Sequence, residues 1–238
     1  MKTPENPMKI DLHNFFLHYD PKNPKHVAAV EELKKDLEQK QPDLIQDESN
    51  WVRIFREKAP VPAQTGVLKV PYYPQTDNYR DADRTCNSSS CAMVLEYLKP
   101  GTLKGAKGDD AYVQKVFAIG DSTDHTVQTK VLESYGVKSY FSYNLSFSDI
   151  DKSLSAGKPV VIGILHRGSL SAPTGGHMVV VIGKKGQDYV VNDPYGSLND
   201  GYTGAVINGK GAVYTKEVLK YRWLENGKDK TGWGRIFK

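Results

Sequence analysis

One segment of this chain predicts a helix that is apolar on nearly every side, and it constrains the fold more than any other feature. Residues 91–98 read CAMVLEYL. A helix at a protein surface keeps a polar face, so a helix that is apolar around most of its circumference is buried. We therefore predict a central core helix that begins near Cys86 and ends at Lys99-Pro100-Gly101.

The start of this helix favours a reactive thiol. An extended segment precedes Cys86, and Asn87, Ser88 and Ser89 are all competent to cap the first turn. The unpaired N–H groups of a first turn create a positive potential that stabilises an anion. A thiolate is such an anion, so this position favours a low thiol pKa and a nucleophilic Cys86.

The second cysteine, Cys91, lies on the same helix as Cys86. A separation of five residues turns the two side chains roughly 140° apart around the axis, which does not suit a disulfide. We expect both thiols to be reduced. Cys91 is the alternative nucleophile, but its place inside the apolar part of the helix predicts a buried, inert side chain.

Composition bounds the class of protein. Of 238 residues, 25% are charged and 39% hydrophobic, and the net charge is +4. No apolar run reaches the ~20 residues of a membrane helix, so we expect no membrane insertion. The positive charge is spread out and accompanies no nucleic-acid-binding motif, so we expect no nucleic-acid partner. The polar N-terminus lacks the apolar core of a signal peptide. We expect a cytoplasmic protein, or one released to the cell wall by lysis if it is phage-encoded.

Three segments are expected along the chain: a small helical appendage at residues 1–58, a linker at 59–66 and the main domain at 67–238. The prolines of residues 59–66 favour an extended linker. The appendage has apolar residues spaced by three and four, as in an amphipathic helix: Val27, Ala28, Val30, Leu33 and Leu37. Its role stays open between a packing element and a substrate-binding or inhibitory pro-segment.

In the main domain, helices precede strands, which predicts an α+β fold. After a strand candidate at 67–73 and the core helix, three helices are expected, at 109–117, at 123–135 with Thr123 as cap and Gly136 as stop, and at 146–155. From Lys158 on, runs rich in β-branched residues predict a mostly antiparallel sheet, with strands at 159–165, 178–182, 189–191 and 233–237.

The polar loop at 76–84 carries three acidic and two basic residues: Asp77, Asp81, Asp83, Arg80 and Arg84. It lacks the full oxygen-ligand pattern of a calcium loop, so ion pairing on a solvated loop is the better interpretation. The sequence leaves open whether a metal binds there, and we predict no cofactor.

A nucleophilic thiol needs a base, and His177 is the best placed of six histidines. It opens a predicted strand directly after Gly175-Gly176, and the next strand ends at Asn192-Asp193. If the two strands pair as an antiparallel hairpin, His177 and Asp193 become neighbours. His166 has no following strand with an acid in register, so we expect a rim or substrate contact. His125 lies in a first helical turn, which disfavours a cation.

An acyl-transfer site also needs a donor to the developing oxyanion. Gln75, at the end of the strand candidate before Cys86, could fold back over the helix start and supply an amide N–H. Trp223 and Trp233 could either line a groove or anchor the last strand, and anchoring is the simpler interpretation.

Four motifs, taken in order, resemble the papain-like cysteine peptidases related to bacteriocin-processing, double-glycine leader peptidases. They are VPYYPQ at 70–75, CNSSSCAMVL at 86–95, GGHMVVVIG at 175–183 and YVVNDPYG at 189–196. The resemblance covers about residues 67–237. It implies a papain-like fold with Cys86 as nucleophile, His177 as general base and acid, Asp193 as the group that orients the histidine, and Gln75 in the oxyanion hole. The chain departs from the family pattern at Asn87-Ser88, where Gly-Pro is usual.

The resemblance extends to lytic enzymes of phage or bacterial origin, because the sequence shows no transporter helices and is mildly basic. The expected substrate is therefore a peptide, and cleavage of peptidoglycan stem peptides by an endolysin-like enzyme is the leading hypothesis. Three alternatives stay open: a protein-directed cysteine protease, an acyltransferase with the same residues, and an inactive binding module.

Overall fold

The computed structural model describes residues 66–238 and, before them, residues 23–25, 27, 28, 32 and 35. The chain divides into two compact units, Met1–Ala63 and Gln64–Lys238. In the first unit, residues 24, 25, 27, 28, 32 and 35 have helical backbone, within the segment where a helix is expected. The other expectations for residues 1–65, including the appendage and nearly all of the linker, lie outside the described residues.

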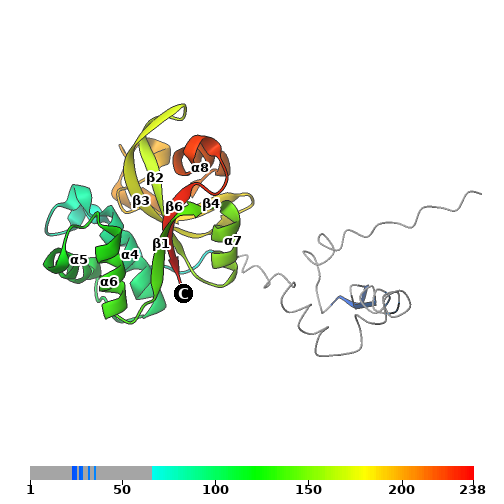
Figure 1. Ribbon diagram of the computed structural model, residues 1–238, viewed down its shortest axis with the longest axis horizontal. Coiled ribbons are helices and arrows are strands. Elements are labelled where there is room, and N and C mark those ends of the chain that lie inside the picture. Colours follow the sequence, from blue (N-terminus) through cyan, green and yellow to red (C-terminus); the bar gives the residue numbers. More distant parts are fainter. Residues whose placement is uncertain (1–22, 26, 29–31, 33–34, 36–65) are drawn as a thin grey trace, which may run out of the picture. The chain divides into compact units, whose positions relative to one another are not determined.

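The second unit is an α+β domain with one six-stranded sheet, as predicted (Figure 1). The strand order is β1-β6-β2-β3-β4-β5, and every neighbouring pair is antiparallel. The strands are β1 (Ser139–Leu145), β2 (Val160–Ser169), β3 (Ala172–Lys185), β4 (Asp188–Asn192), β5 (Lys210–Tyr214) and β6 (Gly232–Phe237). The helices are α4 (Cys86–Leu98), α5 (Gly108–Ile119), α6 (His125–Ser134), α7 (Phe147–Ser155) and α8 (Lys216–Trp223).

Helix α4 is the central core element that its composition predicts. Cys91, Ala92, Met93, Val94 and Leu95 are all fully buried. The helix packs against α5 and α6 and against β3, and the three helices gather on one side of the sheet while α7 and α8 lie on the other (Figure 1). Burial of a continuous apolar helix is thus what joins the helical half of the domain to the sheet.

The expected caps of two helices are wrong. Residue Thr85 precedes α4 and makes no side-chain cap bond. Ser88 instead shares a 2.7 Å hydrogen bond with Ser122, in the loop between α5 and α6, because the buried polar side chains of this turn face that part of the domain rather than their own backbone. At α6 the cap is Asp124 rather than Thr123, and its carboxylate accepts from the N–H groups of two residues in the first turn.

The stop of α6 at Gly136 is confirmed. Its φ of 73° is left-handed, and its N–H donates to the Glu133 carbonyl at 2.8 Å. The strand expected at 67–73 is not formed. Leu68 donates one hydrogen bond to the Ile182 carbonyl at 2.8 Å, but Pro71 has no N–H to continue a ladder.

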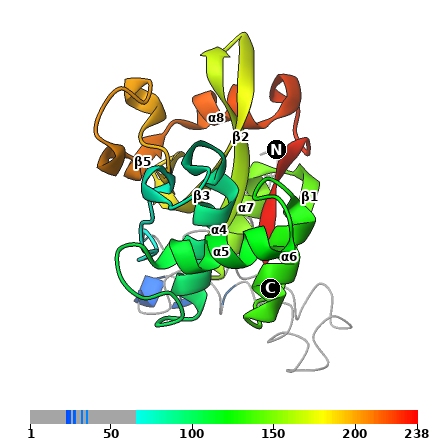
Figure 2. The same ribbon diagram turned by 90° about the vertical axis from the view of Figure 1, so that its left-hand side faces the viewer.

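The β2–β3 hairpin is longer than its sequence predicts and projects beyond the helices (Figure 2). Strand β3 begins at Ala172 rather than at His177, so His177 lies inside the strand. The additional residues are rich in Ser, Thr and Gly, and these residue types predict a turn rather than a strand. Arg222 of α8 supports the outer part of this hairpin through the carbonyls of Leu165, Arg167 and Gly168, at 2.6, 3.0 and 3.0 Å.

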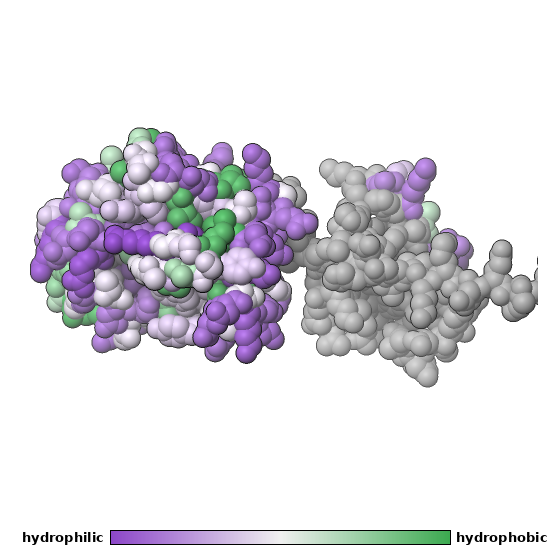
Figure 3. Space-filling view, turned by 90° about the horizontal axis from the view of Figure 1, so that it is seen from above, coloured by the Kyte–Doolittle hydropathy of each residue, from purple (hydrophilic) through white to green (hydrophobic). Residues whose placement is uncertain are grey.

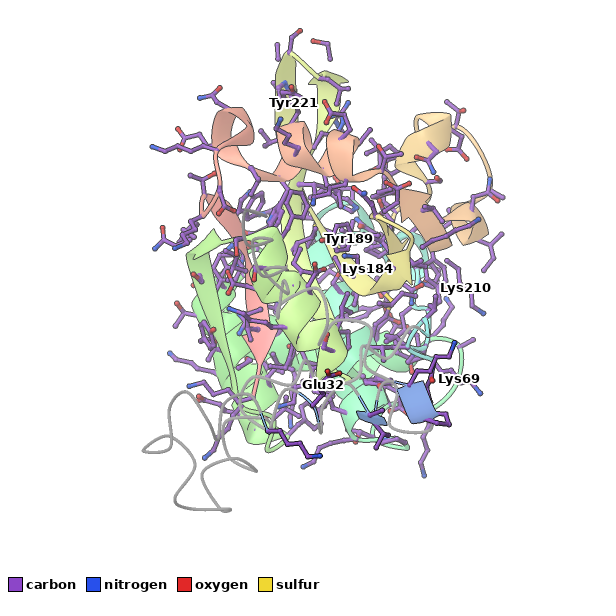
Figure 4. All side chains as sticks on the ribbon, turned by 90° about the vertical axis from the view of Figure 1, so that its right-hand side faces the viewer. Glu32, Lys69, Lys184, Tyr189, Lys210 and Tyr221 are labelled. Atoms are coloured by element: carbon purple, nitrogen blue, oxygen red, sulfur yellow. The ribbon has the colours of Figure 1, made fainter. Side chains whose placement is uncertain are left out.

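Asp151 of α7 fixes that helix to the other end of the sheet. Its carboxylate accepts from Lys184 Nζ and from the Tyr189 hydroxyl, both at 3.0 Å. Lys184 and Tyr189 are partners in the β3–β4 ladder and lie beside each other in Figure 4.

On the upper face in Figure 3, apolar residues gather near the middle of a largely polar surface. Within the described residues, no helix is both long enough and apolar enough to cross a membrane.

Gly163 of β2 provides a direct test of this packing. A Cβ at Gly163 would overlap the indole ring of Trp233, a residue of the neighbouring strand β6. We predict that Gly163→Ala lowers the free energy of unfolding by about 1–3 kcal/mol, because the indole must move out of its site. Gly66→Ala is the matched control, since a Cβ there meets nothing within 4 Å. Urea unfolding measures both, and equal midpoints for the two variants would contradict the packing.

Candidate active site

Cys86 is the first residue of α4 and carries a partly exposed, free thiol. Hydrogen bonding from the His177 ring and from the backbone groups of Met178 and Asn87 lowers the pKa of this thiol. The sulfur therefore lies where the helical half of the domain meets β3. Cys91, by contrast, is fully buried, as predicted, and burial raises the pKa of its thiol.

His177 joins Cys86 to Asp193. Its Nε2 lies 2.7 Å from Asp193 Oδ1, so its other ring nitrogen, Nδ1, is the one left for the sulfur. The antiparallel pairing of β3 and β4, with Val180 opposite Asn192, brings the two residues together in the way that the sequence pattern predicts. His177 is only 3% exposed and Asp193 is fully buried.

Both oxygens of Asp193 are held by several donors. Oδ1 also accepts from the backbone N–H of Tyr195 at 3.0 Å. Oδ2 accepts from the hydroxyls of Tyr202 at 3.1 Å and Tyr214 at 2.6 Å. A carboxylate with this many donors is fixed in orientation. Neither tyrosine was identified from the sequence, because nothing in a local pattern shows that two distant hydroxyls converge on one carboxylate.

The electrostatics of the site favour a thiolate and an imidazolium. Burial alone would raise the pKa of Cys86, but the hydrogen bond and charge of His177 outweigh it, and the thiol pKa lies below its ordinary value. Burial alone would lower the pKa of His177, but Asp193 and Cys86 raise it to about 10. Asp193 contributes most to the raised pKa of His177, and the attraction between His177 and Cys86 contributes to both shifts.

Gln75 lies in a short 3-10 turn, Gln75–Asp77, and is 1% exposed. Its backbone N–H donates at 2.8 Å to the carbonyl of Pro194, the residue that follows Asp193. Its Nε2 donates to the Ala82 carbonyl at 2.8 Å, while Oε1 has no partner in the described part of the chain. An amide nitrogen carries two hydrogens, so one Nε2–H remains for another acceptor.

The turn that carries Gln75 is tied to the start of α4. The side-chain nitrogen of Asn78 donates to Thr85 Oγ1 at 2.8 Å and to Ser89 Oγ at 2.9 Å. Ser89 in turn donates to the buried Asp109 carboxylate at 2.7 Å. These bonds fix the position of the amide relative to the helix that begins at Cys86.

His166 and His125 both lie closer to the site than their sequence positions indicate. The half-buried ring of His166 stacks on His177, with centroids 4.8 Å apart. His125 accepts a 3.2 Å hydrogen bond at Nδ1 from Asn87, the residue after Cys86. Burial and the charge of Arg235 lower the pKa of His125 to about 4, so its ring stays neutral, as its position at a helix start predicts.

An aromatic row flanks the site. The His125 ring stacks on Phe141, and Trp233 packs edge-on to the same histidine with centroids 6.4 Å apart. At its other end, Trp233 comes within 3.7 Å of where a Cβ on Gly176 would lie, next to His177. The row of His125, Phe141 and Trp233 therefore extends from Asn87, next to Cys86, to Gly176, next to His177. Trp223, by contrast, is buried and donates to the Trp233 carbonyl at 3.0 Å.

The acidic loop forms exposed ion pairs. Arg80 pairs with Asp81 at 3.1 Å, and Arg84 pairs with Asp121, outside the loop, at 3.1 Å. Across the described residues, no group of three or more His, Cys, Asp or Glu side chains is arranged to hold a metal ion.

Comparison with known proteins identifies the family. The Peptidase_C39-like family model matches residues 67–231, so the chain belongs to that family. It is accordingly a cysteine peptidase. No curated protein sequence matches the chain.

Two solved structures are similar to this chain. One is a double glycine motif protease from an AMS/PCAT transporter in complex with its leader peptide, at 20% identity and a TM-score of 0.47, covering 74% of this chain and 96% of that one. The other is a C39-like peptidase from Bacillus anthracis, at 16% identity and a TM-score of 0.49, covering 72% and 96%.

The ion pair can be tested without a substrate. Because the pKa of Cys86 is lowered, its alkylation by iodoacetamide should reach half its maximal rate below the ordinary thiol pKa of about 8.5. His177→Ala removes the stabilising cation but leaves the burial, so its midpoint should rise to 8.5 or above. Mass spectrometry of labelled peptides separates Cys86 from Cys91. A wild-type midpoint at or above 8.5 would contradict the ion pair.

Proposed function

We propose that this protein hydrolyses peptide or amide bonds with Cys86 as the nucleophile, His177 as general base and acid, and Asp193 as the group that orients the histidine. The observation that carries the proposal is the single buried His177 ring, bonded to Cys86 on one side and to Asp193 on the other. A thiolate paired with an imidazolium and steadied by a carboxylate is the arrangement that acyl transfer to sulfur requires.

The reaction follows from the positions of these groups. The Cys86 thiolate attacks the carbonyl carbon of the substrate, and His177 gives its proton to the departing amine. The remaining thioester is attacked by water, whose proton passes to His177, and the acid product leaves Cys86. Asp193 holds the ring in place through both proton transfers because its own oxygens are fixed by the tyrosines.

The oxyanion is assigned to two donors, the backbone N–H of Cys86 and the free Nε2–H of Gln75. Support comes from the way Gln75 is fixed, since its backbone bonds to Pro194, beside Asp193, and its amide bonds to Ala82, before Cys86. Donors that are already fixed stabilise the tetrahedral intermediate without reorganising during the reaction.

We predict that Cys86→Ala and His177→Ala each lower the rate of peptide hydrolysis by at least about 10³-fold, because neither step proceeds without these groups. Asp193→Asn should slow the reaction less, since it affects orientation. Gln75→Ala should lower kcat by about 10²-fold with little change in KM, because the oxyanion forms only after attack. Steady-state kinetics on a cleaved peptide measures all four.

Cys91→Ala is the matched control, since it changes the other cysteine of the same helix, which is fully buried. Its activity should remain within about twofold of wild type, with a loss of stability of about 1 kcal/mol. Full hydrolysis by Cys86→Ala, or loss of activity in Cys91→Ala alone, would contradict the assignment.

For the substrate we propose the stem peptides of peptidoglycan, as in an endolysin. The net charge of +4 supports binding to an acidic cell wall. The second candidate is an unfolded protein or peptide, and the half-exposed aromatic row beside the site supports it, because an apolar side chain could pack there. Acyl transfer to an added amine would use the same residues.

These substrates are separated by incubating purified peptidoglycan and a denatured protein, each with wild type and with Cys86→Ala. We expect new free amines from the stem peptides, detected by mass spectrometry, with wild type only. An added amine that appears in the product would indicate acyl transfer. Cleavage of the denatured protein with no fragment released from peptidoglycan would reject the cell-wall substrate.

A further inference from the structure

The ring of His177 is covered although exposed residues adjoin it. His166 stacks on it at a centroid distance of 4.8 Å and an interplanar angle of 25°. The rings of Tyr195 and Tyr202 meet it edge-on, each at 6.1 Å. As a result, His177 is only 3% exposed, whereas the preceding Gly176 is exposed. His166 provides the one stacked face of this enclosure among the described residues.

The β2–β3 hairpin is built to place His166 there. Ile164 is the ladder partner of His177, so His166, two residues along β2, lies on the same face of the sheet. Gly175 has a left-handed φ of 70°, and a Cβ on it would lie 3.2 Å from His166 Cδ2. The three carbonyl bonds from Arg222 hold the same part of the hairpin from α8.

The surroundings keep the covering ring neutral. The charged groups that face His166 are His177 on β3, Arg167 on its own strand, Arg222 on α8 and Asp193 after β4. Three of these are cationic when His177 is protonated. Burial, followed by the charge of His177, lowers the pKa of His166 to about 4. At neutral pH a neutral aromatic ring, and not a second cation, therefore lies against the imidazolium.

Exclusion of water matters for a base that carries charge during the reaction. The attraction of His177 to Asp193 and to the Cys86 thiolate is stronger in a dry environment than beside bulk water. A planar neutral ring excludes water from one face of the imidazolium and leaves both nitrogens at the edge free for their partners. The stack is suited to this because it adds no competing donor in the plane of the ring.

We propose that His166 is a positioning residue of the catalytic base: its ring covers the face of His177, excludes water, and holds the two nitrogens toward Cys86 and Asp193. This inference rests on the proposed function of His177. It does not require that His166 touch the substrate or transfer a proton.

Two substitutions separate covering from chemistry. His166→Ala removes the ring, and His166→Phe keeps a planar ring without nitrogens. We expect the midpoint of Cys86 alkylation to rise by about one pH unit in the alanine variant, with kcat about tenfold lower and KM little changed. The phenylalanine variant should restore both to within about twofold of wild type.

The outcomes are distinguishable. A wild-type alkylation midpoint in the ordinary thiol range would overturn the proposed function itself. A low wild-type midpoint with no change in His166→Ala would overturn only the covering role. Loss in both variants would also overturn it, because a ring nitrogen would then be needed. Urea unfolding checks that each variant is folded, and His166→Thr, which suits a strand, replaces alanine if that variant does not fold.

Discussion

The site depends on one buried hydrogen bond, the 2.7 Å contact between His177 Nε2 and Asp193 Oδ1. It fixes which ring nitrogen faces Cys86, and it stabilises the imidazolium that in turn stabilises the thiolate. The bond exists only because β3 and β4 pair in one register, since a shift by one residue would turn His177 to the other face of the sheet. Sheet register is thus a direct requirement of the proposed chemistry.

The second requirement is the burial of α4. A helix apolar on nearly every side has to be enclosed, and here α5, α6 and the sheet enclose it. Enclosure leaves its first residue, Cys86, at the boundary between the helices and β3. Two elements far apart in the sequence therefore bring together the sulfur and the ring. The Gln75 turn is attached to the segment after β4 through Pro194 and to the start of α4 through the Asn78 bonds.

Much of this could be predicted from the sequence because it rests on local patterns. The apolar run gives the buried helix, and the β-branched runs with a short turn give the hairpin that pairs His177 with Asp193. The caps of α4 and α6, the start of β3 and the stack of His166 could not be predicted in this way. The α6 cap is a choice between two neighbouring residues, Thr123 and Asp124, and Thr123 bonds to Asp121 instead. The other features depend on side chains from distant segments, such as Ser122 and Arg222, or on a backbone conformation such as that of Gly175.

The charge state of His177 in the resting enzyme tests the central interaction most directly. Nitrogen-15 NMR of the histidine rings, recorded from pH 5 to pH 9, distinguishes a doubly protonated imidazolium from a neutral ring. With its pKa raised to about 10, His177 should remain doubly protonated to pH 9 and should become neutral at a lower pH once Cys86 is alkylated. A His177 ring that loses its proton near the ordinary histidine pKa of about 6.5, whether or not Cys86 is alkylated, would contradict the ion pair.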